Sequence, residues 1–162
     1  MSAVLQNPGV ERVRTALAAA GLDVEIVELP GAARTARAAA EFLGCAVAQI
    51  ANSLVFRALT SDSALLVLSS GARRVDLERL AAIVGEPIAK ADADFVRART
   101  GFAIGGVAPV GHATPLRSFI ERSLAVLDPL WAAAGHPHTV FRLSYAELLR
   151  VSGATPIDAA CA

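Results

Sequence analysis

The sequence feature best suited to chemistry is an uncharged segment of thirteen residues, 100–112, that contains four glycines, one proline and one histidine. Glycine weakens the interior of a helix or strand by roughly 0.5–1 kcal/mol relative to alanine, so this run favours a loop with accessible backbone N–H groups. Fixed N–H donors stabilise the oxyanion that develops when an ester is attacked. We therefore predict a binding wall here, with a structural turn and β-bulge as the alternative.

The sequence lacks the motifs of several other common functional sites. No Gly-Lys-Ser/Thr follows the glycines, as a Walker loop requires, and Gly101, Gly105 and Gly106 do not have dinucleotide-binding spacing. His136 and His138 flank a proline without a third ligand at metal-binding spacing. The chain also has no GxSxG sequence around a serine nucleophile. We expect no Walker or Rossmann nucleotide site, no metal site and no serine hydrolase triad.

The composition is that of a folded, single-domain chain. Its 162 residues are 54% hydrophobic and 19% charged, unlike a disordered chain, and residues 1–162 are expected to form one domain. The apolar runs are much shorter than the roughly 20 residues of a membrane span. The N-terminus lacks the basic and apolar regions of a secretory signal. These observations predict a cytoplasmic protein.

Charge and cysteine usage restrict the class further. Fifteen basic and fifteen acidic residues balance, which argues against sequence-blind coating of nucleic acid. Cys45 and Cys161 lie far apart without metal-binding spacing, so neither a zinc site nor a disulfide framework is predicted. Cys45 is interpreted as a small buried hydrophobic residue.

Capping residues, glycines and hydrophobic periodicity predict the elements that must position the glycine segment. Helices are expected over residues 8–20, 36–43, 77–84, 94–99, 145–151 and from Asp128-Pro129 through Trp131 to Gly135. Strands are expected over residues 24–29, 53–59, 64–68, 88–90, 116–120 and 139–143, with a short edge element after residue 154. A hairpin among mixed elements favours an α+β fold, with a parallel α/β sheet as the alternative.

Four segments, residues 35–44, 49–57, 70–76 and 100–112, resemble a known family in the same order. They are similar to the YbaK and prolyl-tRNA synthetase associated domains, which edit mischarged tRNA. With a strand at residues 115–121 and the late helices, the resemblance extends from about residue 35 to residue 153. It implies an α+β fold, with a mixed, barrel-like β-sheet surrounded by helices.

The resemblance also implies a function. A free-standing member of this family acts in trans as an aminoacyl-tRNA deacylase, hydrolysing the ester between a wrong amino acid and the 3′ adenosine. The implied substrate is tRNA-Pro carrying alanine, cysteine or another small amino acid, and no cofactor or metal is implied. The implied partner is the aminoacyl-tRNA 3′ end, with prolyl-tRNA synthetase as a further candidate; no membrane or DNA partner is expected.

The family's GxxxP loop corresponds to residues 105–109 of this sequence. By resemblance, Gly105 and Gly106 hold the substrate carbonyl and the terminal adenosine through backbone groups. Asn52 stands where the family usually has lysine, before Ser-Leu-Val-Phe, and is the third expected catalytic residue. The remaining expected substrate contacts are Thr35, Leu54, Phe56, Ser70, Gly71, Gly101, Val107, Ala108, Pro109, Gly111 and His112.

Two alternative functions remain open, and Asn52 and the neutral net charge favour the first of them. Lysine supplies a point charge that can meet a phosphate or the scissile ester, whereas asparagine supplies an uncharged amide. The first alternative is a non-catalytic YbaK-like module that binds tRNA 3′ ends, nucleotides or aminoacyl groups. The second is an esterase that acts on another small aminoacyl ester.

Overall fold

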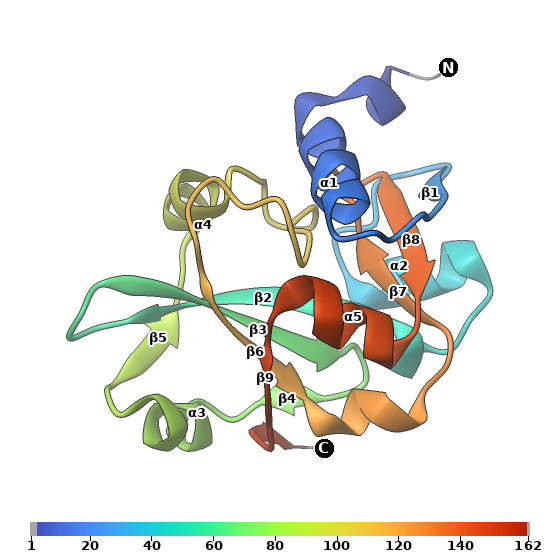
Figure 1. Cartoon of the computed structure of the whole chain (residues 1–162). Helices are drawn as coiled ribbons and strands as arrows, with labels where there is room; N and C mark the ends of the chain where they lie inside the picture. Colours follow the sequence, from blue (N-terminus) through green and yellow to red (C-terminus); the bar gives the residue numbers. More distant parts are fainter. Residues whose placement is uncertain (1–2, 162) are drawn as a thin grey trace.

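The computed structural model describes residues 3–161, in which helices and strands alternate along the chain (Figure 1). The helices are α1 (Pro8–Ala19), α2 (Ala36–Leu43), α3 (Leu77–Val84), α4 (Ala93–Thr100) and α5 (Tyr145–Ser152), with 3-10 turns η1 (Val4–Gln6), η2 (Val47–Gln49) and η3 (Arg122–Val126). The strands are β1 (Ile26–Glu28), β2 (Ala51–Ala58), β3 (Ser63–Ser70), β4 (Arg74–Val75), β5 (Ile88–Lys90), β6 (Arg117–Glu121), β7 (Leu130–Ala133), β8 (Thr139–Leu143), β9 (Thr155–Ile157) and β10 (Ala160–Cys161).

The strands form two main sheets with helices around them. The larger sheet has the order β5-β2-β3-β6-β9, antiparallel from β5 to β3 and parallel from β3 to β9. The smaller is the antiparallel sheet β1-β8-β7, and β4 pairs separately with β10. A parallel bridge between Ile50 and Trp131 joins the two main sheets. The predicted α+β fold with a mixed sheet is confirmed.

Local capping explains why the predicted helices begin and end where they do. The Thr35 hydroxyl accepts a hydrogen bond from the Ala38 N–H at 3.1 Å at the start of α2, and Gly44 ends that helix in the left-handed region. Ser144 and Glu147 form the predicted capping box of α5. These interactions are local in sequence, so the pattern alone predicted them.

The predicted helix around Trp131 is wrong. Residues Leu130–Ala133 form β7, which pairs with β8 in an antiparallel ladder. Leu130 and Ala132 are fully buried while Trp131 is half-buried, which is the two-residue period of a strand. Asp128-Pro129 resembles a helix start, but pairing with a distant strand overrides that local signal.

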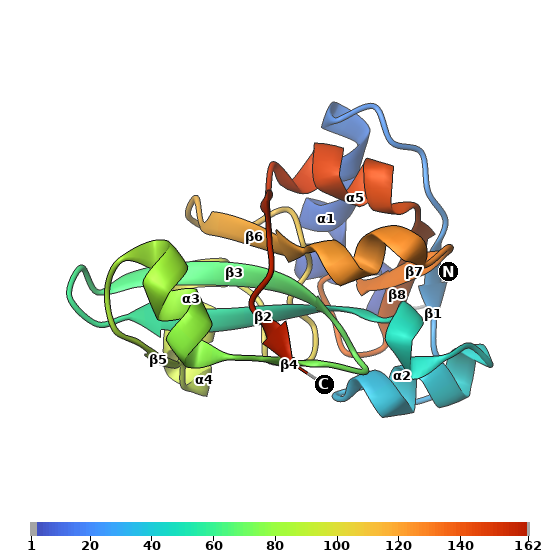
Figure 2. The same cartoon turned by 90° about the horizontal axis from the view of Figure 1, so that it is seen from below.

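Two apolar clusters hold the larger sheet in place. On one face, Val13 and Leu17 of α1 belong to the same buried cluster as Leu66 and Leu68 of β3. On the other face, Leu80 of α3 packs in a second cluster that includes neighbouring β3 residues. In Figure 1 α1 lies above this sheet and α3 below it, and in Figure 2, seen from below, α3 lies in front of the strands. Within residues 3–161, no helix is long and apolar enough to cross a membrane.

Candidate functional site

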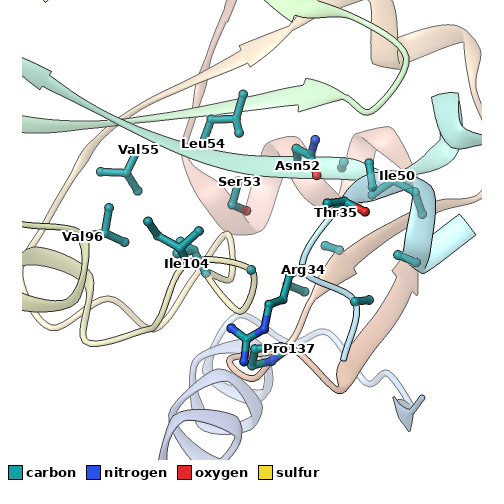
Figure 3. A pocket seen from close by; sticks show the side chains of 18 of the residues that line it. Arg34, Thr35, Ile50, Asn52, Ser53, Leu54, Val55, Val96, Ile104 and Pro137 are labelled. Atoms are coloured by element: carbon teal, nitrogen blue, oxygen red, sulfur yellow. The ribbon is translucent and has the colours of Figure 1, made fainter. Parts of the chain in front are cut away.

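A cavity of about 740 Å³ lies along one edge of β2 (Figure 3). On this side β5 pairs only with residues 56–58 of β2, and the bridge at Ile50 closes the other end. Neither pairing includes Ser53, which lies between them. The cavity therefore occupies a gap in the pairing of β2 rather than a gap between helices.

The backbone of β2 presents polar groups to this cavity. The Leu59 N–H donates to the Pro87 carbonyl on the β5 side, whereas the Ile50 carbonyl accepts from the Gly71 N–H on the β3 side. Backbone groups alternate sides along a strand, so the N–H and C=O of Ser53 point toward the β5 side and the cavity. The site thus has a backbone donor and acceptor that the sequence analysis did not assign.

The two faces of β2 give the cavity two different walls. Leu54 projects to one side of the strand, while Ser53 and Val55 project to the other, toward Ile104 and Val96 (Figure 3). Leu54 belongs to the α3-side cluster, and Val55 packs against the main cluster that contains Val96. A ligand lying across this edge of β2 would contact both walls.

The rim of the cavity is positively charged. Among the described residues that line it there is no aspartate or glutamate, but there are four cationic side chains. Each ion pair found within residues 3–161 involves other arginines, so none of these four has an ion-pair partner in that range. A chain of zero net charge therefore concentrates positive charge at this cavity, as a polyanionic ligand requires. The four residues are Arg34, Arg73, Arg74 and Lys90.

The glycine loop forms the wall opposite β2 through Ile104, Gly105 and Val107. Gly105 has φ +91°, and a Cβ there would lie 3.1 Å from the Arg34 Cα. Both observations favour glycine, because the left-handed region and the close backbone leave no room for a side chain. The loop and the segment that carries Arg34 therefore pack directly against each other.

Gly106 has a packing role that the resemblance did not indicate. It is absent from the described lining residues, and a Cβ there would lie 2.9 Å from the Cα of His136 and 3.0 Å from Pro137 Cδ. Gly106 thus allows the loop to pack on the turn between β7 and β8. Its contact with substrate remains a prediction, while its contact with this turn is a structural fact.

Arg12 of α1 holds both ends of the glycine segment. Its guanidinium donates to the carbonyls of Gly101 at 2.8 Å and Gly111 at 3.3 Å, and it lies 4.7 Å from the centre of the Phe102 ring. Gly101 and Gly111 therefore anchor the loop and do not line the cavity. No sequence signal links Arg12 to residues so far along the chain.

His112 also supports the base of the loop. Its Nε2 lies 2.7 Å from the Ala108 carbonyl, and its ring meets Phe102 edge to face. Burial lowers the pKa of His112 below its usual value, assisted by the charge of Arg12 and opposed by the hydrogen bond to Ala108. The ring is therefore neutral at pH 7 and donates a hydrogen bond to the carbonyl through Nε2.

His112→Ala is expected to lower stability by roughly 1–3 kcal/mol, because the buried Ala108 carbonyl loses its donor. A lowered histidine pKa means that the unfolded chain binds more protons than the folded protein as pH falls below about 6.5. Stability should therefore fall on acidification through that range, and less steeply in the variant. Melting temperatures between pH 8 and pH 5 measure both effects. A loss of turnover at unchanged melting temperature would contradict this supporting role.

The structure divides the expected site residues into two groups. Thr35, Asn52, Leu54, Phe56, Gly105 and Val107 line the cavity. The other expected residues do not line it, and several of them support residues that do. Ser70 donates to the Ala48 carbonyl at 2.8 Å, and a Cβ at Gly71 would lie 2.5 Å from the Cβ of Ala36. The expected residues outside the described lining are Ser70, Gly71, Gly101, Gly106, Ala108, Pro109, Gly111 and His112.

Sequence reasoning missed part of the cavity wall. The Arg73-Arg74 doublet lies inside a segment that carries the family resemblance, so its charge was a usable signal. Ser53 and Trp131 gave no such signal, because only the strand edge and the joining of the sheets bring them to the cavity. The lining residues that were not assigned include Arg34, Ser53, Arg73, Arg74, Lys90, Ile104, Trp131 and Thr139.

The cavity lacks the usual parts of nucleophilic catalysis. Its described lining has no histidine, cysteine, aspartate or glutamate that could activate the hydroxyls of Thr35, Ser53 or Thr139. Cys45 lies elsewhere, and burial raises the pKa of its thiol, so the thiol stays protonated. The groups that do line the cavity can bind, orient and polarise a substrate. Such a site favours attack by a molecule that arrives with the substrate or from solvent.

Comparison with known proteins decides the family. Residues 31–151 match the model of the aminoacyl-tRNA editing domain. This chain belongs to that family. The matched range includes β2, the cationic rim and the glycine loop, so the cavity lies within the editing domain.

Similar proteins extend over nearly the whole chain. A crystal structure of a candidate trans-editing enzyme for prolyl tRNA synthetase is 43% identical, with a TM-score of 0.87 over 94% of this chain and 96% of that one. YwhH, an uncharacterised protein of Bacillus subtilis (strain 168), is 27% identical and covers 88% of this chain and 90% of its own. Hypothetical protein APE2540 shares the fold with a TM-score of 0.86 at 24% identity over 93% of this chain and 99% of its own.

Proposed function

We propose that this editing domain, acting as a single unit over residues 1–162, is a trans-acting aminoacyl-tRNA deacylase. Its proposed substrate is a mischarged tRNA, tRNA-Pro carrying alanine, cysteine or another small amino acid. The observation that carries the proposal is the rim of four cations around a cavity with backbone hydrogen-bonding groups. Within residues 3–161 these cations have no ion-pair partner, and no carboxylate lines the cavity. A polyanionic ligand that ends in an ester fits both features.

The geometry suggests how hydrolysis would proceed. The rim cations bind phosphates of the tRNA 3′ end, which places the ester against β2 and the glycine loop. Water then attacks the ester carbonyl, the bond to the ribose oxygen breaks, and that oxygen takes the proton that the water loses. Amide donors at the cavity stabilise the negative charge on the carbonyl oxygen during attack. Asn52 and the backbone of Gly105 are the proposed donors.

Similarity supports the choice of tRNA. The solved protein that is 43% identical carries the description of a candidate trans-editing enzyme for prolyl tRNA synthetase. We infer the same tRNA class for this chain, with prolyl-tRNA synthetase as a candidate partner and a cytoplasmic location. A separate editing site is useful because one methylene changes binding by only about 1–3 kcal/mol in a synthetase pocket.

One observation favours the non-catalytic alternative. Asn52 lines the cavity and carries no charge, where the family usually has lysine. A module that binds the aminoacyl end without cleaving it would retain the cationic rim and lose the reactive cation. Both functions thus require binding of the aminoacyl end of tRNA, and only the deacylase hydrolyses the ester.

A panel of aminoacylated tRNAs tests the proposal. Purified protein is incubated with tRNA-Pro charged with alanine, cysteine, serine, threonine or proline, and ester loss and binding are both measured. Hydrolysis of one or more mischarged species, with prolyl-tRNA spared, supports the deacylase. Binding without turnover supports the module. Absence of both would contradict each function.

Asn52→Ala is expected to reduce hydrolysis by roughly one to two powers of ten, the effect of removing a buried polar partner worth 1–3 kcal/mol. Asn52→Lys should strengthen tRNA binding and make it more sensitive to salt, because a new cation adds a counterion-release term. Binding at two salt concentrations and hydrolysis at one distinguish the three proteins. If Asn52→Ala matches the unmodified protein in both assays, Asn52 does not contact the substrate.

A further inference from the structure

Glu121 is a buried carboxylic acid that the proposed chemistry does not use. It is the last residue of β6, lies opposite Ile157 of β9 and is only 2% exposed. Burying a carboxyl group costs stability unless hydrogen bonds replace those that it made with water. An apolar side chain at this position would avoid that cost, so the groups that the carboxyl contacts indicate its role.

The carboxyl of Glu121 binds the backbone near the C-terminus. Its Oε1 accepts a hydrogen bond from the N–H of Ala159, a fully buried residue, at 2.9 Å. Burial raises the pKa of Glu121, and hydrogen bonds from the backbone of Ala159 and Ala160 oppose that rise. The charge of Asp158 raises the pKa further and the charge of Arg73 lowers it. This rim arginine is therefore within electrostatic reach of the carboxyl.

Residues 158–161 form the C-terminal segment, which runs beside β4. The Asp76 N–H donates to the Ala159 carbonyl at 2.7 Å, and Cys161 of β10 lies opposite Arg74 of β4. In Figure 2 the dark-red β10 lies next to β4. Within residues 3–161, β10 is the only strand that pairs with β4. The backbone that carries Arg74 therefore has its strand partner in the C-terminal segment.

Two further side chains bind the C-terminal segment from its exposed side. Arg122 forms an ion pair with Asp158 at 2.8 Å, and the Arg79 guanidinium donates to the Ala160 carbonyl at 3.3 Å. Exposed ion pairs contribute little to stability, because water and salt screen them. The hydrogen bond to Glu121 is buried, so its loss should disturb the segment most.

We propose that Glu121 is a positioning residue for the Arg73-Arg74 pair on the cavity rim and acts through the C-terminal segment. The described lining of the cavity includes both arginines, but neither Glu121 nor any residue of the segment. The inference rests on the proposed function, in which the rim cations bind phosphates of the tRNA. An acidic residue outside the cavity thus favours binding of an anionic ligand, because it holds two arginines in place.

Removing the carboxyl therefore has two effects of opposite sign. A protein that loses an acidic group attracts phosphates equally well or better, because negative charge repels them. A protein that loses the contact between Glu121 and the C-terminal segment binds tRNA more weakly, because Arg73 and Arg74 are no longer fixed before the ligand arrives. The direction of the change in affinity distinguishes the positioning role from a simple charge effect.

The test compares Glu121→Ala with a matched control, Glu147→Ala. The Glu147 carboxyl also accepts a backbone hydrogen bond, from the Ser144 N–H at 2.8 Å, but Glu147 lies in α5 and does not line the cavity. Affinity for uncharged tRNA-Pro is measured by fluorescence anisotropy across a salt series. Thermal melting shows whether each protein is folded at the assay temperature.

Glu121→Ala is expected to weaken tRNA binding roughly tenfold at about 0.15 M salt and to lower the slope of log K against log salt by about 1.4, the contribution of two phosphates. For a hydrolysed aminoacyl-tRNA the loss should appear in KM, with little change in kcat. Glu121→Gln keeps an acceptor for the Ala159 N–H and should retain most of the affinity. Glu147→Ala should bind tRNA as well as the unmodified protein or better. Unchanged or tighter binding by Glu121→Ala, or an equal loss in Glu147→Ala, would overturn the inference.

A second variant removes residues 159–162 and leaves Glu121 in place. It should reproduce the weaker binding and the lower salt slope, and adding Glu121→Ala to it should cause no further loss, because both changes remove the same contact. This variant also tests the inference if Glu121→Ala does not fold. Unchanged tRNA binding after removal of these residues would contradict it.

Hydrogen–deuterium exchange separates this inference from the deacylase function, because it needs no tRNA. In the free protein, the backbone amides of residues 73–76 should exchange roughly tenfold faster in Glu121→Ala than in the unmodified protein, and those of α1 at an equal rate. Faster exchange confined to β4 and its neighbours supports the positioning role even if the protein neither binds nor hydrolyses tRNA. Equal exchange at residues 73–76 in the two proteins overturns it.

Discussion

Gly106→Val is expected to abolish tRNA binding and hydrolysis, with a loss of at least two powers of ten in kcat/KM. A valine Cβ would lie 2.9 Å from the Cα of His136 and 3.0 Å from its carbonyl carbon, and backbone atoms cannot rotate away as a side chain can. The loop must therefore move off the turn between β7 and β8. That movement displaces its neighbour Gly105 from Arg34 and opens the cavity wall.

Gly31→Ala is a suitable control for this substitution. A Cβ there would meet the end of the Phe42 ring at 3.0 Å, which can shift because that ring is 42% exposed. Circular dichroism and thermal melting must show that Gly106→Val still folds. Unchanged kinetics in a folded Gly106→Val protein would show that the glycine loop does not form part of the site.

Replacing all four rim cations with glutamine is expected to weaken tRNA binding by roughly two powers of ten at about 0.15 M salt. For single-stranded nucleic acid, each neutralised phosphate contributes about 0.7 to the slope of log K against log salt. If each cation meets one phosphate, the slope should fall by about three. Fluorescence anisotropy with labelled tRNA across a salt series measures both quantities. The four changes are Arg34→Gln, Arg73→Gln, Arg74→Gln and Lys90→Gln.

The matched control removes the same net charge away from the cavity. It should change the affinity and the salt slope much less, because these arginines do not line the cavity. Equal losses in the two proteins would mean that the net charge of the chain, and not the rim, attracts tRNA. The control changes are Arg14→Gln, Arg79→Gln, Arg122→Gln and Arg142→Gln.

The charge distribution gives a physical context for Asn52. A family lysine at this position would project from β2 into a cavity that already has four cations on its rim. With asparagine there, the positive charge of the site lies only on the rim, where side chains reach solvent and can meet phosphates. Substrate affinity and ester polarisation thus depend on different groups, which the rim variant and Asn52→Ala measure separately.

Much of the local structure was determined by the sequence alone. Asn7 and Pro8 begin α1, Thr35 begins α2, and Asp76 begins α3, each through an interaction within three residues along the chain. Caps of this kind do not depend on the rest of the fold. The glycine segment was likewise predicted to be a loop from its own residues. The four segments of the chain that resemble the editing-domain family were sufficient to indicate that family, which the comparisons confirm.

Only the tertiary structure decided which residues meet. Residues 128–135 have a local pattern that favours a helix, yet pairing with β8 makes Leu130–Ala133 a strand and brings Trp131 to the cavity. Arg12 reaches Gly101 and Gly111 across the fold, so those glycines support the loop and do not line the site.

The limit of sequence reasoning has a physical cause at Ser53. Two neighbouring positions on a strand project to opposite faces, so Asn52 and Ser53 differ in environment although they are adjacent in sequence. Both line the cavity, and which of their groups face it depends on where β5 stops pairing and where the two sheets join at Ile50. Both are contacts between distant segments. Amino-acid types and spacing predicted the family and its loop, and long-range strand pairing decided the walls of the site.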